Sequence, residues 1–105
     1  MALIVSDTQT GITADTATAA VKTLYESTYF LVNTTVATAG TLDIEVEWSV
    51  NGATWVSFST PDDFAQITTT GETWLAAVPG RAAFFRLNYV VVTGPFTFEV
   101  SGIGF

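Results

Sequence analysis

Three acidic side chains come closest to a catalytic or metal-binding arrangement in this chain. Asp43, Glu45 and Glu47 alternate with apolar residues in the segment TLDIEVEWSV. On a β-strand they would share one face, with alternate residues roughly 6.6 Å apart. Carboxylates separated by about 5 to 9.5 Å can act as acid and base in glycoside hydrolysis, and carboxylates are also ligands that Ca²⁺ prefers.

The surroundings of these acids argue against both chemistries. A hydrolase holds its two carboxylates in a cleft, where different environments separate their pKa values, whereas this pattern places all three in register on an exposed strand face. No calcium-loop spacing accompanies them. The chain has no histidine and no cysteine, which excludes imidazole catalysis, thiol nucleophiles and thiolate metal sites. We therefore expect a protein that is not an enzyme and that has no cofactor and no metal site.

Two other interpretations of the acidic residues stay open. In the first, Asp43, Glu45 and Glu47 face Arg86 or a basic surface of a partner, where complementary charge sets the register of docking. In the second, they simply form a solvated strand face. On the first interpretation all three are candidates for docking to a partner.

The tryptophans raise the alternative of a carbohydrate-binding module. Trp48 falls on the apolar face of its strand, so we expect it to pack in the core. Trp55 and Trp74 lie near the ends of expected strands, and both are candidates for stacking on a sugar ring.

The elements that would position these residues are β-strands. Alternation over 42–50 predicts a strand with one buried face, and Asn51-Gly52 directly after it is the dipeptide best suited to a type I′ hairpin turn. Short strands separated by turns are typical of an antiparallel β-sandwich or jelly roll, so we expect an all-β chain with a single sandwich domain over 26–105. Further strands are expected at 29–36, 54–58, 64–69, 73–78, 83–92 and 96–103, with a turn-forming segment at 59–63.

Residues 1–25 have a different texture, because Ala and Thr dominate from 11 to 23. We expect an N-terminal arm or a first strand here; a helix beginning at Asp15 is a weaker alternative, because Thr is a poor helix former. Leu3, Ile4 and Val5 are candidates for docking at a sheet edge of this chain or of a neighbour. They form no conventional signal peptide, and no apolar run is long enough to span a bilayer, so we expect no membrane partner.

The composition points to association with other chains. Only 12% of the 105 residues are charged, about half the usual level, while 49% are hydrophobic. Either Thr and Ser cover the surface, or other chains do, because the centres of interfaces are depleted in charge; we favour the second. The net charge of −7, with only three Lys and Arg residues, argues against nucleic acid as a partner.

From residue 27 onward the chain resembles small β-sandwich proteins of tailed-bacteriophage virions, most of all capsid decoration (cement) proteins. Gly80-Arg81 before an aromatic strand is one shared feature. The segments that carry the rest of the resemblance are YFLVNTT (29–35), LDIEVEWS (42–49), NGATWV (51–56), FAQIT (64–68) and FTFEV (96–100).

This resemblance implies a non-enzymatic virion structural protein that stabilises a phage head by docking across capsid subunits. It implies a homotrimer whose partner is the major capsid protein, made in the host cytoplasm and located on the outer capsid surface. No catalytic residues are carried over. Similar sandwiches occur in tail and neck proteins, so a tail or neck structural protein remains an alternative.

Overall fold

The computed structural model describes residues 1–58 and 62–105. In these residues the chain forms β-strands and no helix. The strands are β1 (Ala2–Ile12), β2 (Thr16–Ala17), β3 (Val21–Lys22), β4 (Ser27–Ala37), β5 (Gly40–Ser49), β6 (Val56–Ser57), β7 (Gly71–Pro79), β8 (Phe84–Thr93) and β9 (Phe96–Gly104).

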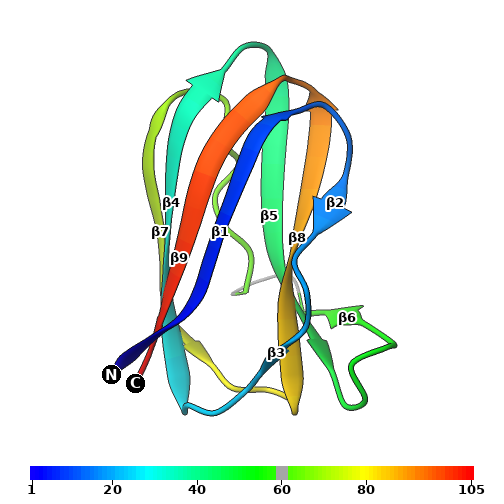
Figure 1. Cartoon of the computed structure of the whole chain (residues 1–105), viewed down its shortest axis with the longest axis vertical. Coiled ribbons are helices and arrows are strands. Elements are labelled where there is room, and N and C mark those ends of the chain that lie inside the picture. Colours follow the sequence, from blue (N-terminus) through cyan, green and yellow to red (C-terminus); the bar gives the residue numbers. More distant parts are fainter. Residues whose placement is uncertain (59–61) are drawn as a thin grey trace.

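The strands form two antiparallel sheets packed face to face, which confirms the expected β-sandwich. The first sheet has the order β1-β9-β4-β7, and the second has the order β2-β8-β5-β6, with β3 also paired to β8. Figure 1 shows β1, β9, β4 and β7 side by side in one layer, with β5 and β8 in the other. Both ends of the chain lie at the same end of the first sheet, where Ala2 pairs with Gly104.

The core forms where the inward faces of the two sheets meet. Aromatic rings join the layers: the ring centroids of Phe30 and Phe85 are 5.9 Å apart, and those of Tyr89 and Phe98 are 4.9 Å apart. Each fully buried apolar side chain contributes about 1.5 to 3 kcal/mol. The period-two pattern predicted these inward faces correctly except at Val50, which follows the end of β5 and is 80% exposed. The correctly predicted buried residues are Leu42, Ile44, Val46, Trp48, Phe85, Leu87, Tyr89, Val91, Phe96, Phe98 and Val100.

The expected two-residue hairpin at Asn51-Gly52 is wrong. β5 ends at Ser49 and β6 begins at Val56, and of the two turn residues only Gly52 has a positive φ, 76°, whereas a type I′ turn needs both. The reason is local side-chain hydrogen bonding. Ser49 Oγ accepts hydrogen bonds from the backbone N–H groups of Asn51 (3.2 Å) and Gly52 (2.9 Å), and these bonds compete with a tight turn and hold a wider loop.

The segment expected as a strand at 64–69 pairs only through isolated bridges. Residues 62–67 run along the free edge of β5, where Phe64 N–H donates to Ile44 O (3.0 Å), and Leu42 and Ile67 exchange two bonds of 2.9 Å. Residues 59–61 of the expected turn at 59–63 lie outside the described residues. The remaining expected strands occur with shifted ends.

Of the two alternatives for the N-terminal region, the structure has a first strand. Ala2–Ile12 pairs along β9, and Val5 is buried in the core at 7% exposure. β2 and β3 then pair with β8, and the weaker alternative, a helix beginning at Asp15, is not formed. Residues 2–22 therefore add three strands to the sandwich.

Candidate docking surfaces

The acidic stripe, Asp43, Glu45 and Glu47, lies on the outer face of β5, and all three side chains accept hydrogen bonds from neighbours. Ser57 Oγ donates to Glu45 Oε2 at 2.6 Å, and Gln66 Nε2 lies 3.2 Å from both carboxylate oxygens of Asp43. These bonds fix β6 and the 62–67 segment against β5. The acids are half-buried and still present carboxylate oxygens to a partner.

Glu47 pairs with Arg86, as one of the two open interpretations proposed. Arg86 Nε donates to Glu47 Oε1 at 2.7 Å, with side-chain exposures of 28% and 16%. The Arg86 guanidinium carbon also lies 4.6 Å from the ring centroid of Trp55. One face of Trp55 is therefore covered by a cation, which leaves less of the ring available for a sugar.

Trp74 is the more exposed of the two candidate sugar platforms. It lies on the outer face of β7, in the other sheet, and is 62% exposed. The structure therefore does not bring Trp55 and Trp74 together. Trp48 is buried at 4% exposure, as expected for a core residue.

The three N-terminal docking candidates point in different directions. Leu3 pairs with Ile103, and Val5 with Gly102, so a register shift lies between them. Leu3 is 65% exposed, whereas Ile4 packs against the core and Val5 belongs to it. Of these candidates Leu3 is the one that offers most of its side chain to a partner.

Leu3 belongs to an apolar patch that the sequence analysis did not find. The patch lies on the outer face of the first sheet, near the chain ends. Rings of Tyr29 and Phe105 meet edge to face in it, with centroids 5.0 Å apart. We call the following residues the first-sheet patch: Leu3 (65% exposed), Trp74 (62%), Phe105 (49%) and Tyr29 (38%), with the half-buried Leu31 and Ile103.

The first-sheet patch has the size of the largest apolar patch on a typical monomer. The exposed fractions of its four most accessible residues correspond to roughly 400 Å² of apolar surface, taking about 150 to 250 Å² for a large side chain. The largest patch on a typical monomer is about 300 to 600 Å² and is often functional. A sequence sign of this patch exists, because residues 29–32 are apolar on both faces of their strand, which is typical of strands covered on both sides.

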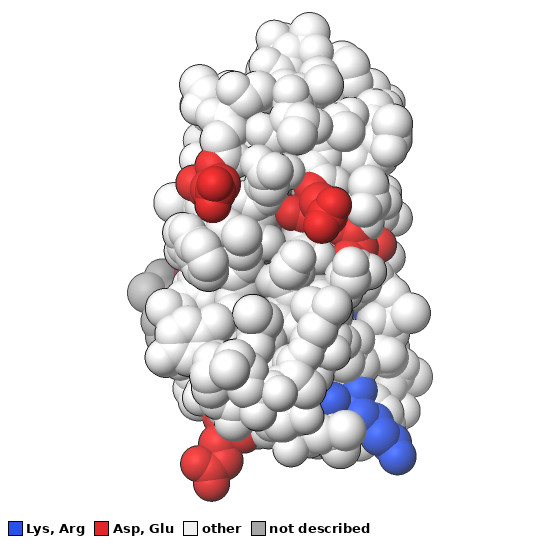
Figure 2. All heavy atoms as spheres, turned by 60° about the vertical axis from the view of Figure 1, so that its left-hand side comes forward, with Lys and Arg blue, Asp and Glu red and all other residues white. Residues whose placement is uncertain are grey.

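Charge is sparse around the patch and is acidic where it occurs. Beside Leu31 and Trp74, the next row of outward residues across the first sheet consists of Thr8, Glu99, Asn33 and Glu72. Thr8 pairs with Glu99, Glu99 with Asn33, and Asn33 with Glu72. Lys22 lies on β3 of the other sheet, and both arginines are held in ion pairs. Figure 2 shows one face of the molecule, on which a few charged side chains stand apart in a broad uncharged surface.

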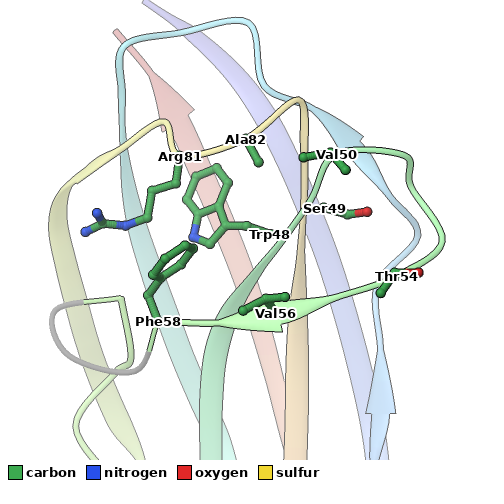
Figure 3. A pocket seen from close by; sticks show the side chains of 8 residues that line it. All are labelled: Trp48, Ser49, Val50, Thr54, Val56, Phe58, Arg81 and Ala82. Carbon is green, nitrogen blue, oxygen red and sulfur yellow. The ribbon is translucent and has the colours of Figure 1, made fainter.

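A pocket of about 270 Å³ opens above Trp48. Figure 3 shows the Trp48 indole beside Phe58 and Arg81 in this pocket. Among the described residues its lining contains no carboxylate and no residue placed to act as a base, and its volume is just below the range of about 300 to 1,000 Å³ usual for a ligand site. The lining residues are Trp48, Ser49, Val50, Thr54, Val56, Phe58, Arg81 and Ala82.

Arg81, the cation among the described lining residues of this pocket, is neutralised by a buried acid. Asp62 is fully buried and accepts from Arg81 Nε (2.5 Å), Arg81 Nη2 (2.9 Å) and Trp48 Nε1 (2.8 Å). The hydrogen bond to Asp62 raises the pKa of Arg81 above its already high ordinary value. The pocket is therefore an apolar recess with a structural ion pair at its wall.

A partly buried hydrogen bond joins the two sheets. Tyr89 Oη donates to Asp7 Oδ2 at 2.7 Å, which links β8 to β1. Burial, and then the hydrogen bond to Asp7, raises the pKa of the Tyr89 phenol. Its role is to hold the first strand against the second sheet.

Neither a metal site nor a membrane-spanning helix is found in residues 1–58 and 62–105. In these residues no three His, Cys, Asp or Glu side chains are grouped so that they could hold a metal ion. The same residues contain no helix that is long and apolar enough to cross a bilayer.

Comparison of the chain with protein-family models, with curated proteins and with solved structures finds no match.

Proposed function

We propose that this chain is a non-enzymatic structural protein of a tailed-phage virion, which stabilises the head by decorating the outer surface of the capsid. The observation that carries the proposal is the first-sheet patch, an apolar surface on a sandwich whose core is already complete. Exposed apolar surfaces of this kind are often functional, and an assembly protein uses one to bind another chain.

The rest of the surface supports assembly rather than catalysis. The acidic stripe lies on the opposite sheet, where its carboxylates accept hydrogen bonds from Gln66, Ser57 and Arg86 and are absent from the pocket. In a decoration protein the stripe would meet basic groups of the major capsid protein, since complementary charge sets register and discourages wrong partners. Several weak contacts made at once then give a high overall affinity.

The test is binding to expanded heads that lack decoration, prepared from the phage that encodes this chain. We expect saturable binding, with extra density outside the shell in electron cryomicroscopy. The double variant Asp43→Asn, Glu45→Gln should bind more weakly, and the control Asp15→Asn, Glu26→Gln, with the same change in charge, should bind like the wild type. Absence of saturable binding by the wild-type chain would overturn the proposal, and immunogold labelling confined to the tail would favour the tail or neck alternative.

Trp74 supports carbohydrate binding as a second candidate function. Its ring is exposed, and Glu72 and Asn33 lie in the adjacent row of the same face, so hydrogen-bonding groups stand beside an aromatic platform. Titration with a panel of oligosaccharides should then shift the tryptophan emission of the wild type and not that of Trp74→Phe. Emission that no sugar changes would exclude this candidate.

A further inference from the structure

We propose that the first-sheet patch is the contact surface between two copies of this chain, packed face to face about a two-fold axis that runs across the strands. The inference rests on the proposed function, because it names the chain that covers the patch of the proposed assembly protein. The register of the sheet supports it, because that register arranges large and small side chains so that the patch is complementary to itself.

Two rows of outward residues cross the first sheet side by side. In the first row Leu3 pairs with Ile103, and Ile103 with Tyr29; opposite Tyr29, the register shift in β7 leaves the small residues Ala76 and Ala77. The side chains of this row are therefore large on β1, β9 and β4, and small on β7.

The second row has nearly the reverse distribution of size. Ser6 pairs with Ser101, Ser101 with Leu31, and Leu31 with Trp74. The side chains of this row are small on β1 and β9, and large on β4 and β7. Trp74 stands in it on the edge strand, where the first row has only alanine.

A two-fold axis between these rows lays each row of one copy over the other row of its partner. Trp74 then lies over Ala76, Leu3 over Ser6, and Ile103 over Ser101, so that each of these large side chains meets a small residue. An isologous contact requires this kind of self-complementarity. If the partner had a different sequence, nothing would require the two rows of this chain to match each other.

The charges agree with this axis. Glu72 and Glu99 lie in the third row, beyond Trp74 and Ser101. An axis across the strands sends the acidic rows of the two copies to opposite ends of the contact, whereas an axis along the strands would place the acidic rows against each other. The apolar centre of roughly 400 Å² is about half of the 800 Å² per partner of a standard interface, and the polar row beside it would form part of the rim.

Sedimentation velocity over a range of protein concentrations tests the pairing. We expect the wild type to be a dimer of twice 11.2 kDa. Trp74→Lys should weaken the dimer by at least about 100-fold, because a tryptophan that packs on the partner is lost from both copies. The control Val92→Lys changes a residue of similar exposure, 56% against 62%, on the other sheet, and should dimerise like the wild type.

A size swap tests the two-fold register itself. Trp74→Ala should dissociate the dimer, and the double variant Trp74→Ala, Ala76→Trp should restore it, because the large and small residues exchange places in both copies. Circular dichroism of each variant checks that the sandwich is folded. Failure of the double variant to restore the dimer would overturn this register.

The other outcomes are equally informative. A wild-type monomer overturns the pairing, as does a mass of three times 11.2 kDa, which would support the homotrimer implied by the resemblance. Equal loss in Trp74→Lys and Val92→Lys also overturns it. Since no capsid enters these measurements, a monomer that still binds heads would leave the decoration proposal standing, and a dimer that binds no heads would leave the pairing standing.

Discussion

Substitution of Arg81 by methionine should be among the most destabilising changes outside the apolar core. Asp62 is fully buried, and the change removes two of the three hydrogen bonds that its carboxylate accepts from side chains. Removing one partner of a buried ion pair costs about 3 to 5 kcal/mol. Because the Arg81 side chain is 26% exposed, solvent already screens part of the interaction, and we expect a loss of about 2 to 3 kcal/mol, a large part of the 5 to 15 kcal/mol typical of a domain.

Urea unfolding followed by circular dichroism measures this loss directly. The melting temperature should fall by roughly 10 to 20 °C, at about 4 to 8 °C per kcal/mol. The matched control is Arg86→Met, which breaks the more open ion pair with Glu47 and the contact with Trp55. We expect that control to cost about 1 kcal/mol, because solvated ion pairs contribute little.

A second variant separates the buried charge from the packing of the arginine side chain. Adding Asp62→Asn to Arg81→Met removes the uncompensated carboxylate and should recover part of the stability, since burying a neutral amide costs less than burying a charge. The reasoning would be refuted if Arg81→Met cost no more than Arg86→Met, or if the double variant were no more stable than Arg81→Met alone.

Three further predictions concern the rest of the sandwich. Tyr89→Phe should cost about 1 kcal/mol near neutral pH, because Asp7 loses a hydrogen bond. The raised pKa of Tyr89 means that the wild type keeps this stability below about pH 10 and loses it as pH rises further; the substitution should flatten that alkaline loss in chemical unfolding. Gly40→Ala should cost on the order of 3 kcal/mol in thermal unfolding, because its φ is 78° and an added Cβ would overlap a carbonyl of the neighbouring strand. Deletion of residues 1–14 should destabilise the sandwich and promote aggregation, seen by circular dichroism and light scattering, because it removes β1 and exposes the edge of β9.

Each of these predictions has a control or an opposite outcome. An alkaline loss of stability that is identical in Tyr89→Phe and the wild type would contradict the role of the phenol. Gly11→Ala is the control for Gly40→Ala, since its φ is +60° but an added Cβ meets nothing within 4 Å; equal costs would contradict the overlap. A deletion variant that does not aggregate and melts at the wild-type temperature would show that β1 is dispensable.

The core could be read from the sequence because its pattern is local. Leu42 to Trp48 and Phe85 to Val91 alternate with period two, and a pleated strand must turn such residues to one side. The ion pair of Glu47 with Arg86 was one of two open interpretations, because nothing local shows that β5 and β8 are neighbours. The loop after Ser49 was predicted wrongly, because a side-chain hydroxyl competed with the turn that Asn-Gly favours.

The sequence by itself determined an all-β fold, the inward faces of β5, β8 and β9, and the exclusion of imidazole and thiol chemistry, all of which follow from residue type and short-range periodicity. Only the tertiary structure decided which outward-facing residues meet. Leu3, Tyr29 and Trp74 share one surface because the strand order β1-β9-β4-β7 joins segments that are distant along the chain. That order results from the packing of two sheets around a common core, and no local pattern encodes it.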